Sequence, residues 1–102
     1  MAAAIPIFHS LAFREFKDAY QWYARRSKKT ARRFYEAVDQ ALDDIAANPT
    51  RWPVFHHHYR WLQLKKFPYV LYFRILDPYH VVIMAVAHGR RRLGYWLRRS
   101  RK

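Results

Sequence analysis

Residues 69–88 read YVLYFRILDPYHVVIMAVAH, and this stretch decides the fold. Valine, isoleucine, tyrosine and phenylalanine dominate both of its halves, which is typical of β-strands. Asp77-Pro78 supplies a turn between the halves. We therefore predict strands over residues 69–76 and 80–88 that pair as an antiparallel hairpin. The alternation from Arg60 to Lys65 adds a third strand just before them.

Upstream of these strands, the sequence predicts a first helix after Ser10, a residue type that caps helix N-termini. Its apolar side chains recur at spacings of three and four residues, which places them on one helical face. They are Phe13, Phe16, Tyr20 and Tyr23. The basic run RRSKK at residues 25–29 interrupts this pattern and indicates a charged turn.

A second amphipathic helix is predicted after Thr30, which can also act as an N-cap. Asn48-Pro49 ends it, because the residue before a proline disfavours the helical region. Two helices joined by so short a turn should form an antiparallel hairpin. The apolar face of the second helix consists of Ala31, Phe34, Val38, Ala41, Leu42 and Ile45.

The order of elements defines the fold class. Ile5–Phe8 reads as a short strand that Pro6 keeps at or near a sheet edge, and residues 52–58 read as a loop. The chain is thus an α+β domain: an N-terminal strand, an antiparallel helical hairpin, and a three-stranded antiparallel meander that forms one sheet. We assign residues 1–98 to this single domain and residues 99–102 to a basic tail.

Both alternating faces of the last two strands are apolar, although two helices can cover only one face of a sheet. The other face should therefore be a groove lined by Val70, Tyr72 and Leu76. A foreign polypeptide or a second copy of the chain could fill that groove equally well.

Composition narrows the classes of function. The chain of 102 residues has no cysteine, which excludes disulfides, thiolate catalysis and cysteine zinc sites. Its net charge is +13, and residues 49–102 carry twelve Lys/Arg and only Asp77, a balance of +11. Such a field should attract nucleic acid, a ribosome or an acidic protein.

We expect no membrane segment and no export signal. The N-terminus lacks a basic leading region, and no apolar run approaches the roughly eighteen residues of a membrane span. These features predict a soluble, cytoplasmic protein.

Three motifs carry a family resemblance. They are Trp22-Tyr23, Ile45 to Pro49 (IAANP), and the pair KFPYVLYFR at 66–74 with AVAHGRRRLGYW at 85–96. In order and separation they resemble the RelE/ParE toxin superfamily, and its ParE-like branch more closely. The match covers residues 5 to about 98. Leu93 stands where the family usually has proline, and the interhelical turn is basic where relatives have glycine.

The resemblance implies the toxin of a type II toxin–antitoxin system, of the plasmid-stabilisation kind, neutralised by a cognate antitoxin that wraps it. ParE-like members of the superfamily poison DNA gyrase, and RelE-like members cut mRNA on the ribosome. We expect a toxin–antitoxin hetero-oligomer whose target is gyrase or the ribosome with its mRNA.

An RNA-cleaving alternative needs a base, an acid and cations for the phosphate. For that role alone, His88 and Tyr95 are the candidate catalytic residues. Arg60 with Arg74 or Arg91 could pair with the phosphate oxygens. A His and a Tyr at a strand end are also common packing residues. Whether the chain is an enzyme stays open at this point.

Binding of a target or of nucleic acid is assigned to the arginines of the second half. The basic tail is interleaved with aromatic side chains, which suits such contacts, and we expect Trp96 to pack on the domain and residues beyond Arg98 to be free. The candidate binding residues are Arg60, Arg74, Arg90, Arg91, Arg92 and Arg98.

His56, His57 and His58 are better read as solvated loop residues than as metal ligands, because adjacent side chains point in different directions and no acidic cluster accompanies them. We expect no metal and no cofactor. A third reading of the whole chain is a basic, regulatory nucleic-acid-binding module.

Overall fold

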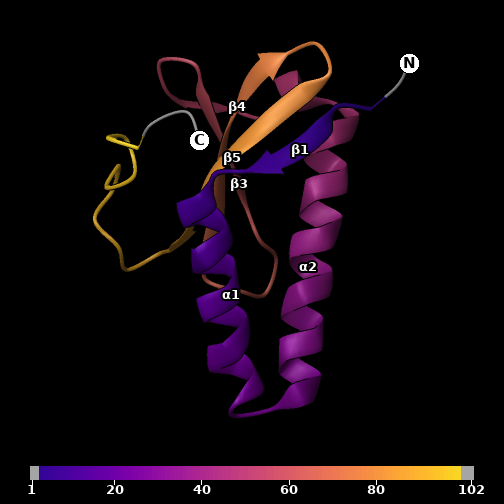
Figure 1. The fold of residues 1–102 in the computed structure, drawn as a ribbon, viewed down its shortest axis with the longest axis vertical. Coiled ribbons are helices and arrows are strands. Elements are labelled where there is room, and N and C mark those ends of the chain that lie inside the picture. The colour runs from indigo at the N-terminus through magenta and orange to yellow at the C-terminus, as the bar shows by residue number, and fades with distance from the viewer. Residues whose placement is uncertain (1–2, 100–102) are drawn as a thin grey trace.

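A computed structural model describes residues 3–99 as one five-stranded sheet packed against two helices (Figure 1). The sheet order is β1-β5-β4-β3-β2. Its strands are β1 (Ile5–Phe8), β2 (Val54–His56), β3 (Tyr59–Gln63), β4 (Tyr69–Asp77) and β5 (His80–His88). The predicted α+β class is confirmed.

The first helix, α1 (Ser10–Ala24), begins one residue earlier than predicted, so the prediction of Ser10 as its cap was wrong. The N-cap is His9, whose Nδ1 accepts a hydrogen bond from the Leu11 N–H at 3.0 Å, and Ser10 is the first helical residue. Phe16 and Tyr23 reach the core from this helix, as their spacing predicted.

The second helix, α2 (Lys28–Ala47), begins earlier than expected. Ser27 caps it by accepting a hydrogen bond from the Thr30 N–H at 3.1 Å, so the prediction of Thr30 as the cap was wrong. Both residue types can cap a helix, and the spacing of apolar residues does not distinguish between them. The helix ends before Asn48-Pro49, as predicted.

The sheet contains one strand more than expected. Residues 54–56, read from sequence as part of a loop, form β2, which pairs with β3 through a tight turn with His57 at φ +51°. A short 3₁₀ helix, η1 (Pro49–Arg51), precedes it. At the opposite edge, β1 pairs with β5 in parallel, from Ile5 beside His80 to Phe8 beside Ile83. Pro6 thus lies on an edge strand, as predicted.

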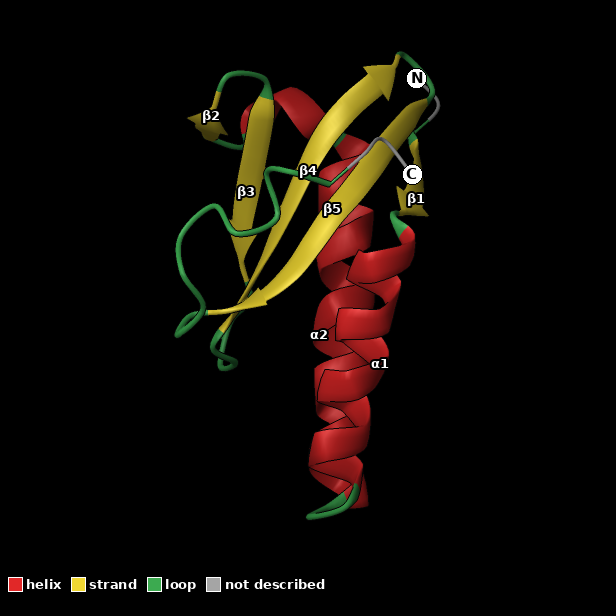
Figure 2. Cartoon of the chain, turned by 60° about the vertical axis from the view of Figure 1, so that its left-hand side comes forward, coloured by secondary structure: helices red, strands yellow, loops and turns green. Residues whose placement is uncertain are grey.

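Both helices cover the same face of the sheet (Figure 2). The main core joins the apolar side of α2 to the inward side chains of β4 and β5, including Phe34, Leu71 and Phe73, none of which is exposed. No helix within residues 3–99 is long and apolar enough to cross a membrane.

The opposite face is covered by the chain itself, which corrects the expectation of an open groove. After β5 the chain folds back, and Trp96 becomes fully buried against the outer side of the sheet. Its ring lies 4.7 Å from that of Tyr72 and 4.9 Å from that of Tyr59. Apolar area on this face is therefore removed from water without a partner chain.

The three predicted groove residues differ in how far they are buried. Val70 and Tyr72 pack in the cluster around Trp96, whereas Leu76 is 42% exposed near the end of β4 and belongs to neither apolar cluster. The C-terminal segment thus packs over Val70 and Tyr72, whereas Leu76 stays exposed. Sequence periodicity located both apolar faces of the strands but did not show which residues of the same chain would cover the second.

Candidate functional site

A cleft of about 590 Å³ opens between α1 and the ends of β4 and β5. It brings together carboxylates of α1, aromatic rings and the first basic residues after β5. The lining residues are Glu15, Asp18, Ala19, Trp22, Tyr23, Pro68, Tyr69, Val86, His88, Arg90 and Arg91. The cleft therefore contains part of the predicted site and a carboxylate that sequence reasoning missed.

His88 ends β5 at the wall of the cleft. Its ring lies edge-on to Tyr69 at 5.1 Å, and its Nδ1 accepts a hydrogen bond from the Arg90 N–H at 3.0 Å. With Nδ1 as acceptor, a neutral ring carries its proton on Nε2. The imidazole thus helps to shape the turn after β5 and keeps one nitrogen for other contacts.

Glu15 is the centre of the polar network at this site. Its carboxylate accepts hydrogen bonds from the Val86 N–H at 3.0 Å and from the Tyr95 hydroxyl, and its side chain is only 15% exposed. It lies between Ala12 and Ala19, the two buried residues of α1, so helical spacing turns it inward. That spacing was the signal available in the sequence.

Arg99 completes this network and corrects the expectation of a free tail after Arg98. Its guanidinium donates to both oxygens of Glu15, Nη1 to Oε1 at 3.0 Å and Nη2 to Oε2 at 2.7 Å, and also to the Met84 carbonyl at 2.8 Å. Bidentate pairing of this kind fixes both partners in orientation. The rest of the predicted tail, residues 100–102, lies outside the described residues.

The local topology explains why these two residues are needed. Strand β1 covers the edge of β5 only as far as Ile83, so later backbone groups of β5 lack a strand partner on that side. Glu15 takes the Val86 N–H and Arg99 takes the Met84 carbonyl. The Glu15–Arg99 salt bridge thus satisfies the backbone groups of β5 beyond the end of β1.

Tyr95 is held in the same network. Burial, together with the hydrogen bond that it donates to Glu15, raises the pKa of its phenol well above the ordinary range. The Arg91 guanidinium stacks 3.8 Å from the centre of its ring. At neutral pH the Tyr95 proton therefore stays with the phenol, and its hydroxyl is already engaged.

Two of the predicted arginines have structural contacts of their own. Arg60 donates to the Trp52 carbonyl at 2.6 Å and to the Thr50 carbonyl at 3.2 Å, which ties β3 to the segment after α2. Arg74 is only 7% exposed, and its Nη2 has no hydrogen-bond partner among residues 3–99. The structure does not bring Arg60 or Arg74 into the lining of the cleft.

The remaining predicted arginines lie around the C-terminal segment. Arg90, Arg91, Arg92 and Arg98 are exposed. Arg91 lies 4.0 Å from Glu15, and the other three take part in no ion pair between described residues. These side chains form a cationic rim beside the cleft.

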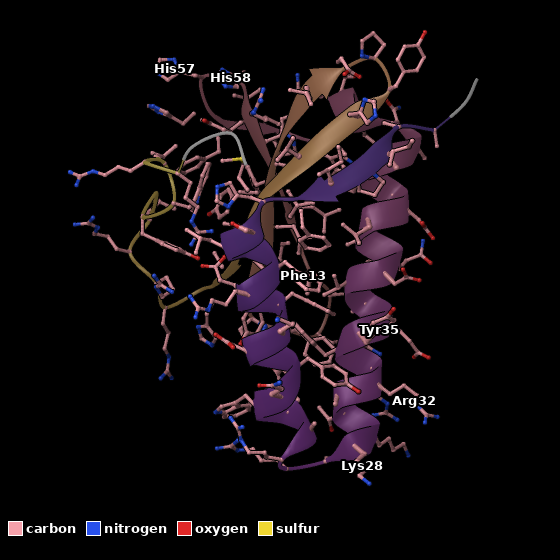
Figure 3. The ribbon with its side chains drawn as sticks, viewed as in Figure 1. Phe13, Lys28, Arg32, Tyr35, His57 and His58 are labelled. Carbon is pink, nitrogen blue, oxygen red and sulfur yellow. The ribbon has the colours of Figure 1, made fainter. Side chains whose placement is uncertain are left out.

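The run His56-His57-His58 does not line the cleft. His57 and His58 lie at the β2–β3 turn and point outward (Figure 3). Residues 3–99 contain no cluster of three or more His, Cys, Asp or Glu side chains that could hold a metal ion.

Comparison with known proteins identifies the family. The model of the ParE toxin family, the toxin of the type II toxin–antitoxin system parDE, matches residues 7–93. The chain belongs to the ParE toxin family. No curated protein matches it in sequence.

The fold of this ParE-family chain is also found among solved structures. A chain of the chromosomal ParDE toxin–antitoxin system from P. aeruginosa superimposes with a TM-score of 0.70 at 12% identity. The match covers 84% of the present chain and 96% of the other. At that identity the likeness concerns the fold, which agrees with the arrangement predicted from the sequence.

Proposed function

We propose that this ParE-family toxin is neutralised by a cognate antitoxin protein and that, when free, it inhibits DNA gyrase by protein contact. The family resemblance supplies gyrase as the target. The observation that carries the contact mechanism is that Tyr95, Arg60 and Arg74, three of the side chains considered for RNA cleavage, are engaged or buried within the fold.

RNA cleavage without a metal needs a free acid or base and cations that can reach the phosphate. The Tyr95 hydroxyl is bonded to Glu15, the Arg60 guanidinium is bonded to backbone carbonyls, and Arg74 is buried. Of the side chains considered for RNA cleavage, His88 and Arg91 line the cleft, and Arg91 also contacts Tyr95 and Glu15. These contacts favour inhibition by binding over catalysis of RNA cleavage.

The cationic rim is the surface that we assign to the target. Arg90, Arg92 and Arg98 are exposed and lack ion-pair partners within residues 3–99, and they follow directly from the cleft wall at His88. Exposed arginines beside a concave surface give a protein partner both charge and shape to bind.

The antitoxin requires an apolar surface, and the structure offers one away from the filled sheet face. Aromatic rings form a continuous series along the channel between α1 and α2, with centroid distances of 5.7–6.4 Å. We call this series the aromatic groove; its members are Phe8, Phe13, Phe16, Tyr20 and Tyr35.

The aromatic groove is only partly shielded by the chain. Phe13 is 45% exposed and Tyr35 51% exposed, and both lie along the channel between the helices (Figure 3). A cavity of about 310 Å³ is lined by four rings of this groove together with Val38 and Leu42. An acidic antitoxin segment with apolar side chains would match both this groove and the net charge of +13.

Growth measurements with and without the partner test the assignment. Induced expression of the chain alone should arrest growth, and co-expression of its cognate antitoxin should restore growth. The double variant Phe13→Ala/Tyr35→Ala should remain toxic but lose rescue by the partner, because truncation of aromatic anchors removes binding energy.

A matched control uses exposed apolar residues outside the aromatic groove. Val54 is 51% exposed and Tyr79 is 68% exposed, and neither lines the groove. The variant Val54→Ala/Tyr79→Ala should be toxic and fully rescued. Equal rescue of both double variants would show that the antitoxin binds elsewhere, and absence of growth arrest by the wild-type chain would contradict the toxin assignment.

A further inference from the structure

The tip of the helical hairpin carries a concentrated positive charge that the proposed toxin function does not use. Six of the nine residues from Arg25 to Arg33 are basic. We call this set the hairpin tip, and all six side chains are exposed. It consists of Arg25, Arg26, Lys28, Lys29, Arg32 and Arg33.

The hairpin tip projects from the body of the molecule. The two helices extend well beyond the sheet, and the turn between them lies at the end of the molecule away from it (Figure 1). Lys28 and Arg32 point outward there (Figure 3). A large partner can therefore approach the tip without contact with the sheet or with the C-terminal segment.

The charge of the hairpin tip is not neutralised by the chain. None of the ion pairs within residues 3–99 includes any of its six basic side chains, and the nearest acidic residues in sequence are Asp18 and Glu36. The one hydrogen bond that the Arg26 side chain donates within residues 3–99 is to the Trp22 carbonyl, at 2.8 Å. The field of six cations is thus directed into solvent.

The placement of these charges works against the stability of the helix. Lys28 and Lys29 occupy the first turn of α2, which contains no acidic residue. Cations at a helix N-terminus oppose the helix dipole and so destabilise the helix. Lys28 with Arg32 and Lys29 with Arg33 are also like charges four residues apart, which repel. Arg25 and Arg26 lie at the favourable, C-terminal end of α1, but helix stability gives no account of the four cations that begin α2.

The geometry favours a rigid polyanion as the partner. The pairs Lys28/Arg32 and Lys29/Arg33 form two rows on neighbouring turns of one helix, with a rise of about 6 Å between members of a row. A protein interface has a buried core that is depleted in charged residues and rich in apolar and aromatic side chains. Within residues 22–33 the only exposed large apolar side chain is Trp22.

The contacts of Trp22 also favour duplex over single-stranded nucleic acid as the ligand. Single-strand binding relies on free aromatic faces on which bases stack. Here the Arg26 guanidinium lies 3.7 Å from the centre of the Trp22 ring and occupies one of its faces. What remains is a set of cations suited to the phosphate backbone, which is the part of a duplex that is bound without regard to sequence.

We propose that the hairpin tip is a binding surface for the phosphate backbone of duplex DNA. This surface is separate from the cleft and from the aromatic groove, and the proposal depends neither on the identity of the toxin's target nor on capture by an antitoxin.

The test uses the purified full chain and a fluorescent 30-base-pair duplex, with anisotropy measured across a series of salt concentrations. In the variant Lys28→Gln/Arg32→Gln, we expect affinity to fall roughly tenfold and the slope of log affinity against log salt to decrease by about 2, since each phosphate contact contributes roughly 0.9 to that slope. Amide shifts on titration with the duplex should centre on residues 25–33.

The control removes the same charge elsewhere. Arg14 and Arg51 are both exposed and lie outside the hairpin tip, so Arg14→Gln/Arg51→Gln should bind within twofold of wild type. Circular dichroism verifies that both variants fold. Equal losses of affinity in the two variants would show that binding depends only on net charge, which would overturn the proposal. So would tighter binding to vesicles of acidic lipid or to single-stranded DNA than to the duplex.

Discussion

Arg99 binds Glu15 through two parallel hydrogen bonds of 3.0 and 2.7 Å, and this pair joins the C-terminal segment to α1 across 84 residues of sequence. The pair also satisfies the edge of β5 beyond the end of β1, through the Val86 N–H and the Met84 carbonyl. It therefore holds in place the segment that covers the second face of the sheet.

Replacement of Glu15 should destabilise the fold. Glu15→Ala leaves the Val86 N–H without its acceptor and the mostly buried Arg99 guanidinium without its counter-ion. We expect a loss of about 3 kcal/mol in the free energy of unfolding, measured in urea. Glu36→Ala, on the exposed side of α2, should change it by less than about 0.5 kcal/mol. Similar losses of stability in both variants would contradict the central role of Glu15 in the polar network.

Truncation of Trp96 should reopen the sheet face that was expected to be free. Trp96→Ala removes a fully buried ring and should cost about 3–5 kcal/mol of unfolding free energy. In this variant Val70 and Tyr72 become exposed to solvent, so an added hydrophobic dye should fluoresce more strongly than with wild type. Trp22→Ala, in which the lost ring is 47% exposed, serves as the control and should cost far less. Wild-type stability of Trp96→Ala would mean that the C-terminal segment does not cover the sheet.

The stability contributed by Tyr95 should depend on pH in the alkaline range. Because the pKa of Tyr95 is raised in the folded state, the folded protein retains a proton that the unfolded chain loses near pH 10. The advantage of wild type over Tyr95→Phe should be complete below that pH and decrease as pH rises further. The unfolding free energies of wild type and Tyr95→Phe, compared at pH 8, 9, 10 and 11, measure this decrease. A difference that stays constant to pH 11 would contradict the raised pKa.

Toxicity should depend on the cationic rim more than on His88 or Tyr95. We expect His88→Ala and Tyr95→Phe to retain growth arrest, since neither removes an exposed arginine. The triple variant Arg90→Gln/Arg91→Gln/Arg92→Gln should lose at least tenfold in toxicity, scored by colony counts after induction. Loss of toxicity in His88→Ala, with antitoxin binding intact, would instead support ribosome-dependent RNA cleavage.

Much of the fold was predictable because side-chain periodicity reports burial directly. The helical spacing of Phe16, Tyr23 and Phe34 and the alternation along residues 69–76 each located a face that the structure buries. The start of α2 was not predictable to the residue, because Ser27 and Thr30 are equally suitable caps. Only the structure shows that the Ser27 hydroxyl meets the Thr30 N–H.

The site was harder to predict because its key contacts join distant segments. Nothing near Glu15 in the sequence indicates Arg99, and nothing near Tyr72 indicates that Trp96 would cover it. His88 and Arg91 line one cleft because they lie close together after a strand end. Arg60 and Arg74 were grouped with them by charge alone, and burial and backbone contacts separate them.

Gyrase-catalysed supercoiling of relaxed plasmid tests the proposed function most directly. The purified chain should inhibit supercoiling in a dose-dependent manner, and addition of its cognate antitoxin should restore it. Normal supercoiling at an excess of the chain, together with cleavage of mRNA only when ribosomes are present, would contradict the account.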